Sequence, residues 1–566
     1  MKDDQSTIIG IDLGTSNSAV TWFSQEGPTL IASNKHKRLL PSVVGLDDNG
    51  HILVGEAAKT RLVSHPHLTV ASFKRYMGTD KAFTLNGQKF RAEELSALIL
   101  RRLKTDAEVE LGCTITRAVI TVPAYFNDLQ RKAVKIAGQM AGLNVERLLN
   151  EPTAAALAYG IAESREQKFL IFDLGGGTFD VSIIDMFDGV IEVRASSGDA
   201  WLGGDDFTEA LRQWMISRYP DLELANSQLS ASLTQQAEEL KRQLSSQERA
   251  SVKLIHAGTE YHWELNESIL HECCRELLSK LKKPVLQALR DAQFDVNQLD
   301  HVILVGGATR MPLIRQLVTR MFNRFPHNEL NPDEVVALGA GVQAGLMAED
   351  CALDDIVLTD VMPYSLGIAT ARCSSDKSDE QIFCPLIERN AFVPVSVMQT
   401  FCTITDYQRQ IAITVYQGES RKVSDNLLLD KMLITIPARK AGEISIDVRF
   451  TYTLDGILEV ECKVIGQETV WKRVIEKTPG MLSEEEIAQR LKALNNLKQH
   501  PRDLPANREL IVEAAKRYEQ ALGEGRQIID YYSTQFELAL EKQDLRLIAS
   551  TKDELRRILD QLNGGR

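Results

Sequence analysis

The chain contains few cysteines for its length, eight in 566 residues. They include no CxxC pair, and no group of cysteines and histidines has zinc-finger spacing. These absences argue against a disulfide framework and against a structural zinc module. We therefore interpret the cysteines as reduced structural thiols, which are typical of a protein in a reducing compartment.

An excess of positive charge is also missing. Lys and Arg number 65 against 78 Asp and Glu, so the formal net charge is −13. A nucleic-acid-binding protein needs a basic surface that displaces counterions, so we expect no nucleic-acid partner. A phosphorylated small ligand is not excluded, because such a site uses local backbone N–H groups.

Long apolar runs are absent as well. Residues 1–7 are polar and acidic and contain no apolar signal core, and no stretch is long and apolar enough to span a bilayer. We therefore expect a cytoplasmic protein without a membrane partner. The 17 prolines and 35 glycines are too few for a collagen-like or disordered chain.

What the sequence does contain is α/β alternation over roughly its first 350 residues. A chain of 566 residues also exceeds what one hydrophobic core can organise, so several domains are expected. Apolar runs that predict strands stand at Ile8–Leu13, Ala118–Val122, Phe169–Leu174 and Val302–Val305. Between them, Ala92–Leu111 and Asp128–Ala141 are predicted helices.

The pattern changes near residue 352. Residues 354–360, DDIVLTD, form a short apolar string between acidic residues, which we interpret as an interdomain linker; an ordinary edge strand is the alternative. Residues 363–480 alternate like β-strands and are broken by turns. From 481 onward the chain is polar and helical, and Ser483 with Glu486 has the spacing of a capping box.

One supersecondary unit occurs twice. Residues 8–23, IIGIDLGTSNSAVTWF, and residues 169–185, FLIFDLGGGTFDVSIID, share an apolar strand, Asp-x-Gly, a tight turn and a returning strand. The repeat predicts a duplicated, two-lobed domain with a cleft between the lobes.

The two repeated turns are candidate phosphate-binding loops. Glycine lets a backbone approach a ligand closely, and successive N–H groups form an anion-binding concavity. A plain turn is the alternative for either loop alone, but the repetition favours a polyphosphate held from both sides. The candidate residues are Gly14, Thr15, Ser16, Gly175, Gly176, Gly177 and Thr178.

Carboxylates beside phosphates require a cation. We therefore interpret Asp12 and Asp173, which end the repeated strands, as Mg²⁺ ligands acting through water. Glu151, in the string NEPTAAALAYG, begins a predicted helix and could share the metal or orient an attacking water. No GxxxxGK[ST] string occurs, so this is not a Walker-type site.

At this point the sequence resembles a known family. The strings IDLGTSNS, TVPAYFNDLQR, NEPTAAALAYG, FDLGGGTFDVS, LGGDDF and LVGGATRMP have the order and spacing of the DnaK-type seventy-kilodalton heat-shock chaperones. The resemblance runs from about Thr7 to Met481 and more loosely to the end. The short C-terminal part and the IVLTD string look most like the HscC-type branch.

The resemblance implies a multidomain fold and an activity. The expected parts are an α/β actin-like two-lobed ATPase domain at 1–352, a linker at 353–362, a β-sandwich substrate-binding domain at 363–480 and an α-helical lid at 481–566. The implied activity is ATP hydrolysis that switches the affinity of a clamp for extended apolar segments of unfolded or client proteins. The expected cofactors are ATP or ADP and Mg²⁺, with K⁺ as a further candidate. The expected partners are client polypeptides, a J-domain cochaperone and a nucleotide-exchange factor.

The resemblance also assigns roles within the nucleotide site. Lys74 matches the catalytic lysine, Thr178 a hydroxyl near the γ-phosphate, and Asp12, Glu151 and Asp173 the metal and water-positioning carboxylates. Further residues match the surroundings of the nucleotide: Gly203, Gly204, Glu238, Lys241, Arg242, Ser245, Gly306, Gly307, Arg310 and Asp333. The family usually has Ser after the paired glycines, where this chain has Ala308, so we expect nucleotide binding to be weaker by about 1 kcal/mol.

Two more sets of residues follow from the resemblance. The set that relays nucleotide state to the linker and to the J-domain surface is Pro123, Arg131, Arg147 and Asp360. The set expected to line the peptide cleft is Ile368, Thr370, Ala371, Phe401, Ile404, Ile411 and Ile413; plain β-core is the alternative for these positions. Departures at Ala371, Ile404 and Ile411 predict a shallower pocket and an altered arch over the peptide. Thr359 reduces the apolar area of the linker, which predicts looser coupling.

Other proteins share such a two-lobed cleft. Sugar kinases and actin-like filament proteins are alternatives, but neither explains a linker, a β-rich region and a helical region after the cleft. A nucleotide-exchange factor without hydrolysis is a further alternative, and the complete set of catalytic candidates argues against it.

Overall fold

A computed structural model describes residues 7–32, 37–160, 166–187, 190–222, 227–327, 329–348, 357–371, 381–453, 456–475, 502, 505–521, 523–542 and 545–563. The chain divides into two compact units, Met1–Pro363 and Tyr364–Arg566. Two predicted regions lie partly outside the described residues: the linker, at 353–356, and the helical region, in its first part at 481–501.

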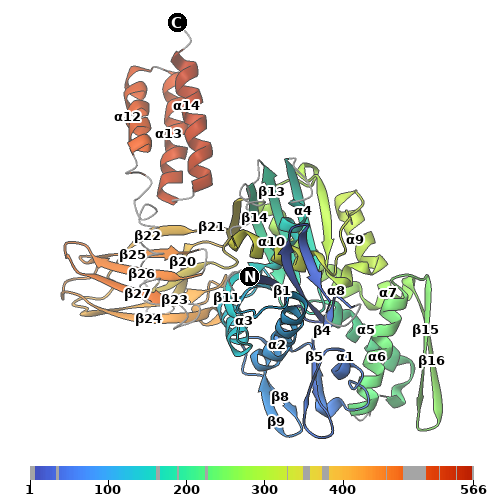
Figure 1. The fold of residues 1–566 in the computed structure, drawn as a ribbon. Helices are drawn as coiled ribbons and strands as arrows, with labels where there is room; N and C mark the ends of the chain where they lie inside the picture. The colour runs from blue at the N-terminus through green and yellow to red at the C-terminus, as the bar shows by residue number, and fades with distance from the viewer. Residues whose placement is uncertain are drawn as a thin grey trace. The chain divides into compact units, whose positions relative to one another are not determined.

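The first unit contains two main sheets, each built around one copy of the repeat (Figure 1). In the first lobe the strand order is β11 (Asn144–Asn150), β10 (Arg117–Val122), β1 (Ile8–Asp12), β2 (Asn17–Ser24) and β3 (Gly27–Ile31). In the second lobe it is β17 (His301–Val305), β12 (Gln167–Leu174), β13 (Phe179–Phe187), β14 (Val190–Asp199) and β18 (Val357–Val361).

The two copies of the repeat form equivalent hairpins. β1 pairs antiparallel with β2 and parallel with β10. β12 pairs antiparallel with β13 and parallel with β17 in the same way. Most residues of β1 and β12 are buried and apolar because helices cover the sheets, as in α/β folds generally.

Two helices hold the lobes together where they cross. α4 (Glu151–Gly160) packs on the second sheet and α10 (Val335–Met347) on the first, and the helices contact each other. A Cβ on Gly339 would lie 1.7 Å from Ala154 O, and one on Gly10 2.3 Å from Ala340 C, so glycine is required at both positions. Thr21 Oγ1 also donates to Ala337 O at 2.8 Å. This crossing places the two hairpins face to face.

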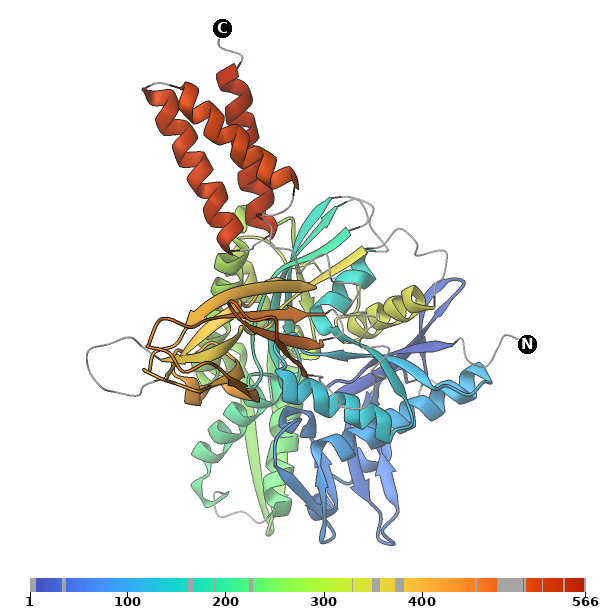
Figure 2. The ribbon, with the colours of Figure 1, turned by 90° about the vertical axis from the view of Figure 1, so that its left-hand side faces the viewer.

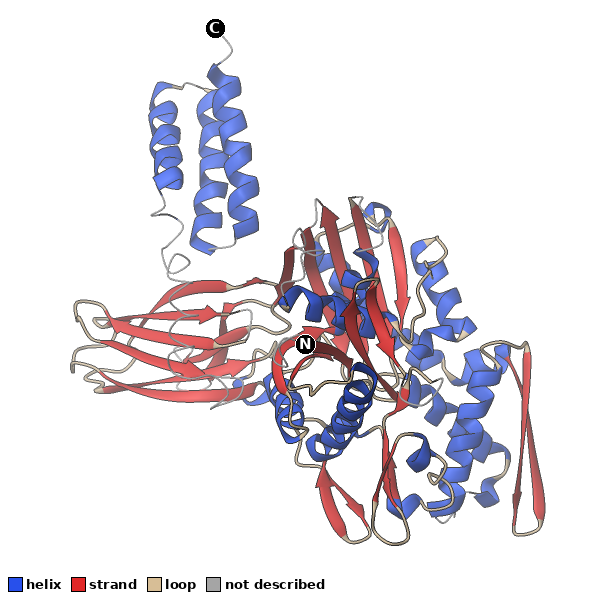
Figure 3. Cartoon of the chain, viewed as in Figure 1, coloured by secondary structure: helices blue, strands red, loops and turns tan. Residues whose placement is uncertain are grey.

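The remaining elements of the first unit surround these sheets (Figure 3). Its other helices are α1 (Glu56–Lys59), α2 (Ala92–Leu111), α3 (Asp128–Met140), α5 (Gly204–Arg218), α6 (Ser227–Gln243), α7 (Glu267–Cys273), α8 (Arg275–Ala292) and α9 (Pro312–Phe322), with 3₁₀ turns that include η2 (Phe73–Tyr76) and η5 (Gly307–Arg310). Its short strands are β4 (Leu40–Pro41), β5 (Val43–Leu46), β6 (Ile52–Val54), β7 (Thr69–Ala71), β8 (Ala82–Leu85), β9 (Gln88–Arg91), β15 (Arg249–His256) and β16 (Thr259–Asn266).

The predicted linker takes the form of a strand. β18 pairs in parallel with β14, with Leu358 opposite Ile191 and Thr359 opposite Glu192. Its described residues therefore form a strand of the second lobe's sheet, though not an edge strand. A linker that docks as a strand is compatible with this pairing.

The second unit contains two four-stranded sheets and a group of helices. One sheet has the order β20 (Gln381–Ile387), β19 (Leu366–Ala371), β23 (Gln410–Gln417) and β24 (Leu427–Thr435). The other has the order β22 (Val395–Cys402), β25 (Ser445–Tyr452), β26 (Leu458–Val464) and β27 (Val470–Ile475). Neighbouring strands are antiparallel, and β25 buries alternate residues, as period-2 packing requires.

Helices α12 (Pro505–Gln520), α13 (Glu524–Lys542) and α14 (Leu545–Asn563) lie side by side (Figure 2). Their shared core includes Leu510, Ile529, Phe536, Leu540 and Leu555. Within the described residues, we find no helix with the length and apolarity needed to cross a bilayer.

Candidate nucleotide site

A cavity of about 1020 Å³ lies between the two hairpins of the first unit, with α4, α5, α6, η2 and η5 contributing to its walls. It is large enough for a nucleotide-sized ligand. The structure brings these predicted residues to its lining: Asp12, Gly14, Thr15, Ser16, Lys74, Glu151, Asp173, Gly175, Gly176, Thr178, Gly204, Glu238, Lys241, Arg242, Ser245, Gly306, Gly307, Arg310 and Asp333.

Two predicted glycines lie behind the lining rather than in it. A Cβ on Gly177 would lie 2.6 Å from Arg75 Cγ and 2.8 Å from Thr15 Cγ2, and one on Gly203 would lie 2.6 Å from Gly176 C. Their missing side chains let the loops pack closely. Their role is therefore to shape the loops, because neither reaches the cavity.

The turns of the two hairpins approach each other closely. A Cβ on Gly176 would lie 2.1 Å from Ser16 Oγ, so a larger residue there would require the Ser16 hydroxyl to move. Behind the first turn, Ser42 Oγ donates to Gly14 O at 2.8 Å and lies 2.9 Å from Ser18 Oγ. The sequence analysis missed Ser42, because nothing in its local pattern distinguishes it from other loop serines.

Buried carboxylates meet one lysine at the inner end of the cavity. Lys74 Nζ donates to Glu151 Oε1 at 2.8 Å, and Lys74 is 3% exposed. Thr121 Oγ1 donates to Asp12 Oδ1 at 2.8 Å, and the N–H of Tyr125 donates to an oxygen of Asp180 at 3.0 Å.

These surroundings raise the pKa of the carboxyl groups. Asp12 faces the cavity, so its surface is only partly covered, but protein surrounds it at longer range and desolvates its carboxyl group. This desolvation, together with the charge of Glu151, raises the pKa of Asp12 to about 7. Desolvation and the charge of Glu151 raise the pKa of Asp180 to about 8. The same two causes hold the pKa of Asp173 well above its usual range. One lysine does not neutralise this cluster, so it favours a bound cation.

The cluster fits a cation held through water. Among the described residues, no three His, Cys, Asp or Glu side chains converge closely enough to hold a metal ion directly. Asp12, Glu151 and Asp173 all line the same cavity, however, and oxygen ligands that keep several waters are typical of Mg²⁺ sites.

Polar side chains of α5 and α6 form another wall. Lys241 Nζ donates to Gly204 O at 3.0 Å and to Thr208 Oγ1 at 2.8 Å. Glu238 accepts from Thr208 Oγ1 at 2.7 Å and pairs with Arg242 at 2.9 Å. Thr208 was not among the predicted residues, although it stands one helical turn after Gly204, where a side chain returns to the same face.

The facing wall comes from η5 and the segment before α10. Gly306 has a φ of +84°, and its N–H donates to Pro332 O at 2.9 Å. Arg310 pairs with Asp333 at 2.6 Å and donates to Asn331 Oδ1 at 2.7 Å. Ala308 lines the cavity beside these residues.

Hydrogen bonds connect three of the four predicted relay residues: Pro123, Arg131 and Asp360. The N–H of Phe126 donates to Pro123 O, and Arg131 donates to Phe126 O and Ala124 O. Arg131 also donates to Asn150 Oδ1 at 2.6 Å, and Asn150 Nδ2 donates to Asp360 Oδ2 at 2.8 Å. A continuous set of hydrogen bonds therefore leads from the turn after β10 to β18.

Arg147 stands apart from this set. It is half-buried on β11, and its backbone pairs with β10 opposite Val119, but its side chain has no hydrogen bond or ion pair with another described residue. The structure therefore places Asn150, and not Arg147, in the continuous set.

The predicted peptide-cleft residues differ in exposure. Ile368 and Ile413 are buried, which fits the β-core alternative, whereas Ile404 is 55% exposed. Thr370, Phe401 and Ile411 are half-buried. Ala371 ends β19 opposite Gln381 of β20.

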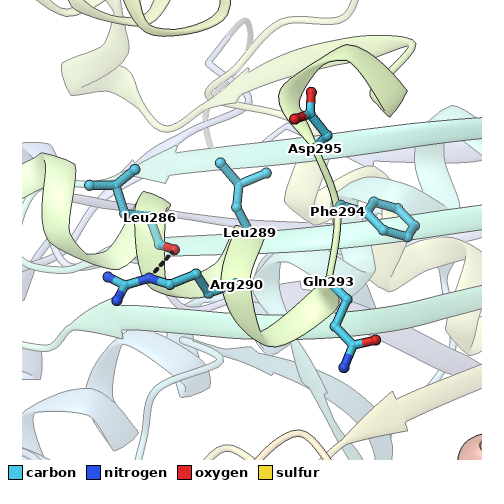
Figure 4. A pocket seen from close by; sticks show the side chains of 6 residues that line it. All are labelled: Leu286, Leu289, Arg290, Gln293, Phe294 and Asp295. Atoms are coloured by element: carbon cyan, nitrogen blue, oxygen red, sulfur yellow. Dashed lines mark hydrogen bonds between the residues drawn. The ribbon is translucent and has the colours of Figure 1, made fainter.

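A second hollow, of about 550 Å³, lies at the end of α8 (Figure 4). Arg290 Nε donates there to Leu286 O at 3.2 Å. The hollow has no glycine loop and no hydroxyl side chain, so it lacks the paired phosphate-binding loops of the first cavity. Its lining residues are Leu286, Leu289, Arg290, Gln293, Phe294 and Asp295.

Ala308 provides a test of the adenosine side. We expect Ala308→Ser to lower the dissociation constant for ADP by about fivefold, because a hydroxyl restores a hydrogen bond worth about 1 kcal/mol. Isothermal titration calorimetry measures this change. Ala231→Ser, which adds a hydroxyl to α6 elsewhere in the cavity lining, is the matched control. An unchanged constant in Ala308→Ser contradicts the prediction.

The raised pKa of Asp180 predicts a pH-dependent stability. Between about pH 4 and pH 8 the unfolded chain has lost this proton and the folded chain retains it, so the wild type loses stability as pH rises. Asn at this position has no proton to lose. The gain in unfolding free energy from Asp180→Asn should therefore be about 1–2 kcal/mol larger at pH 8 than at pH 6. Urea denaturation of the nucleotide-free protein measures both values, and a gain independent of pH contradicts the assignment.

Comparisons with known proteins agree with this geometry. Residues 8–85 and 81–563 match the family model described as Hsp70 protein. The chain is also 40% identical over 520 residues to "Chaperone protein DnaK" of Ureaplasma urealyticum serovar 10, which covers 90% of this chain and 84% of that protein. The family match extends over the cavity-lining elements and the second unit. The chain therefore belongs to the Hsp70 family.

Proposed function

We propose that this protein, an ATP-dependent chaperone and ATPase by its family, works as a nucleotide-switched clamp for extended peptides. The observation that carries the proposal is the convergence of Lys74, Glu151, Asp12, Asp173 and Thr178 on one cavity between two glycine loops. ATP or ADP binds there, and its state is communicated to the second unit through β18.

In this proposal the loops bind and orient the phosphates. Backbone N–H groups and the hydroxyls of Thr15, Ser16 and Thr178 bind phosphate oxygens from both sides. Lys74, already paired with Glu151, offsets the charge that develops on the transferred phosphoryl group. Glu151 orients the attacking water. A bound Mg²⁺ supplies charge neutralisation, with Asp12, Glu151 and Asp173 holding its waters; K⁺ is a further candidate ion at the site.

Adenosine lies between the α6 wall and the η5 wall. Glu238, Lys241, Arg242 and Ser245 face it from α6, and Arg310 faces it from η5. The absence of a hydroxyl at Ala308 weakens this side of the site.

The switch is proposed to act through Arg131, Asn150 and Asp360. Their hydrogen bonds connect the segment after Pro123 with β18, so a shift between the lobes changes how firmly β18 is held. Thr359 Oγ1 is buried and has no hydrogen-bond partner among the described atoms. Burial of an unpaired hydroxyl costs about 1–3 kcal/mol, so docking of β18 is weakened.

The second unit is proposed to be the clamp. Its two sheets, with β20 beside β22 and β24 beside β27, form a β-sandwich at about 363–480. A client segment binds in extended form, with one side chain in a pocket formed by the predicted cleft residues. The helical region at 481–566 serves as the lid. The domain boundaries are part of this proposal.

The binding partners of this protein and its branch within the family are also proposals. Client polypeptides, a J-domain cochaperone that binds near Arg147 and Asn150, and a nucleotide-exchange factor fit this mechanism. The IVLTD string favours the HscC-type branch, and a cytoplasmic location fits the reduced cysteines.

The proposed clamp is tested by single-turnover ATP hydrolysis with a panel of peptides, with proteolysis of the linker followed in parallel. We expect peptides to accelerate hydrolysis and the linker to be protected in ATP and cleaved in ADP. Lys74→Ala should retain ATP binding and lose hydrolysis by two or more orders of magnitude. Hydrolysis that no peptide alters, with an insensitive linker, would contradict the clamp.

The same assay locates the peptide site. Ile404→Ser should raise the dissociation constant for a stimulating peptide about tenfold, because an exposed apolar contact with the peptide is lost. Ile465→Ser is the matched control, since Ile465 is equally exposed, at 55%, in the turn after β26. Equal effects of both substitutions would place the peptide elsewhere.

Thr359 provides a test of linker docking. Thr359→Val removes the unpaired hydroxyl without changing size, so β18 should dock more firmly by about 1–2 kcal/mol. Amide hydrogen exchange at Leu358 and Thr359 should slow accordingly. Thr403 Oγ1 is likewise buried without a described partner, in the second unit. Thr403→Val should leave exchange in β18 unchanged, and slower exchange in both variants would refute a local effect.

A further inference from the structure

The segment that carries Lys74 belongs to the first lobe but is bound to the second. η2 follows β7, and its Phe73 and Lys74 are buried. Ser72, directly before it, has a φ of +55°, a left-handed conformation that costs a non-glycine residue about 1 kcal/mol or more. Such a conformation persists when its surroundings impose it.

Arg75, the residue after Lys74, forms the first bond to the second lobe. Its guanidinium pairs with Asp206 Oδ2 at 3.0 Å and also donates to Trp201 O. Asp206 lies in the first turn of α5 and accepts from Gly203 N at 2.8 Å. Arg75 is thus attached to the cap of α5, next to the second phosphate-binding loop.

Trp201 packs against the same arginine. Its ring lies 5.8 Å from the Arg75 guanidinium carbon, a distance typical of a cation–π contact. It also meets the Tyr76 ring edge-on at 5.5 Å, and Tyr76 meets Phe83 at 5.6 Å. Trp201 is nevertheless 50% exposed, so burial alone does not explain its position.

The stem of Arg75 also lies against the glycine loop. Arg75 Cγ occupies the space where a Cβ of Gly177 would lie, at 2.6 Å. On the other side of Lys74, Ser72 lines the same cavity as Asp205 of α5. The second lobe therefore holds this segment through Arg75, directly after Lys74.

We propose that Arg75, Asp206 and Trp201 are positioning residues that hold Lys74 at the phosphates only while the two lobes are closed. The three residues form an interlobe clasp: when α5 moves away, the clasp opens and η2 is free to withdraw Lys74. Hydrolysis would thereby depend on cleft closure through Lys74 itself. This inference rests on the proposed role of Lys74.

The clasp is tested by measuring ATP affinity and the single-turnover hydrolysis rate separately in the full chain. Arg75→Met keeps the apolar stem and removes the bonds, and Asp206→Asn keeps an acceptor for Gly203 N–H and removes the charge. Each should lower the hydrolysis rate about tenfold, because misplacement of a catalytic group by a fraction of an ångström has effects of this size. ATP affinity should change less than about twofold, since Arg75 and Asp206 do not line the cavity.

Coupling between the residues distinguishes a clasp from independent stabilisation. The double variant Arg75→Met/Asp206→Asn should be no slower than either single variant, since both break the same ion pair. Trp201→Phe should reduce the rate less, because the Arg75–Asp206 pair remains. Subtracting the fluorescence of Trp201→Phe from that of the wild type gives the emission of Trp201. This emission should change when ATP binds, because the clasp closes around the Trp201 ring.

A matched pair on the same helix provides the control. Trp214 and Arg218 of α5 form a similar contact, 5.3 Å from ring to guanidinium, and neither lines the cavity. Trp214→Phe should leave hydrolysis unchanged. Normal hydrolysis in Arg75→Met while Lys74→Ala is inactive would overturn the clasp and leave the proposed function intact. Normal hydrolysis in Lys74→Ala would overturn the role of Lys74 and the clasp with it.

Discussion

The crossing of α4 and α10 is the constraint on which the rest of the first unit depends. The helices approach so closely that Gly339 has no room for a side chain beside Ala154 O. Each helix packs on the sheet of a different lobe, so their separation sets the distance between the two hairpins. A bulkier residue at this crossing would separate the glycine loops and leave the phosphates without one of their two walls.

The electrostatics of the cavity follow from that closeness. Asp12 and Asp173 come from different lobes, and Glu151 begins the helix between them. Brought together in a desolvated space near the charge of Glu151, Asp12 and Asp173 disfavour ionisation, as the raised pKa of each of these two groups shows. A cation relieves the repulsion among the carboxyl groups and between them and a polyphosphate. Binding of a cation with a nucleotide therefore favours the arrangement in which the lobes are close together.

The connection between the cavity and β18 depends on weaker interactions. Arg131, Asn150 and Asp360 connect the lobes to β18 by single hydrogen bonds, and Thr359 leaves a hydroxyl unpaired in that strand. A strand held this way can be released by a small free energy. This suits the proposed switch, in which β18 docks in one nucleotide state and detaches in the other, because an equilibrium shifts only when its states lie within a few kcal/mol.

The sequence by itself determined the strands, the duplicated hairpins, the carboxylates that end them and the family. These features are local: Asp-x-Gly after an apolar strand, repeated, specifies the same turn chemistry wherever the copies lie. The tertiary structure alone decided which distant residues meet. Arg75, Asp206 and Trp201 come from separate segments with no shared motif, Asn150 rather than Arg147 completes the hydrogen bonds to β18, and Ile368 and Ile413 are core residues. Their contacts depend on how the lobes and sheets pack, and side-chain packing across such distances leaves no periodic signal in the chain.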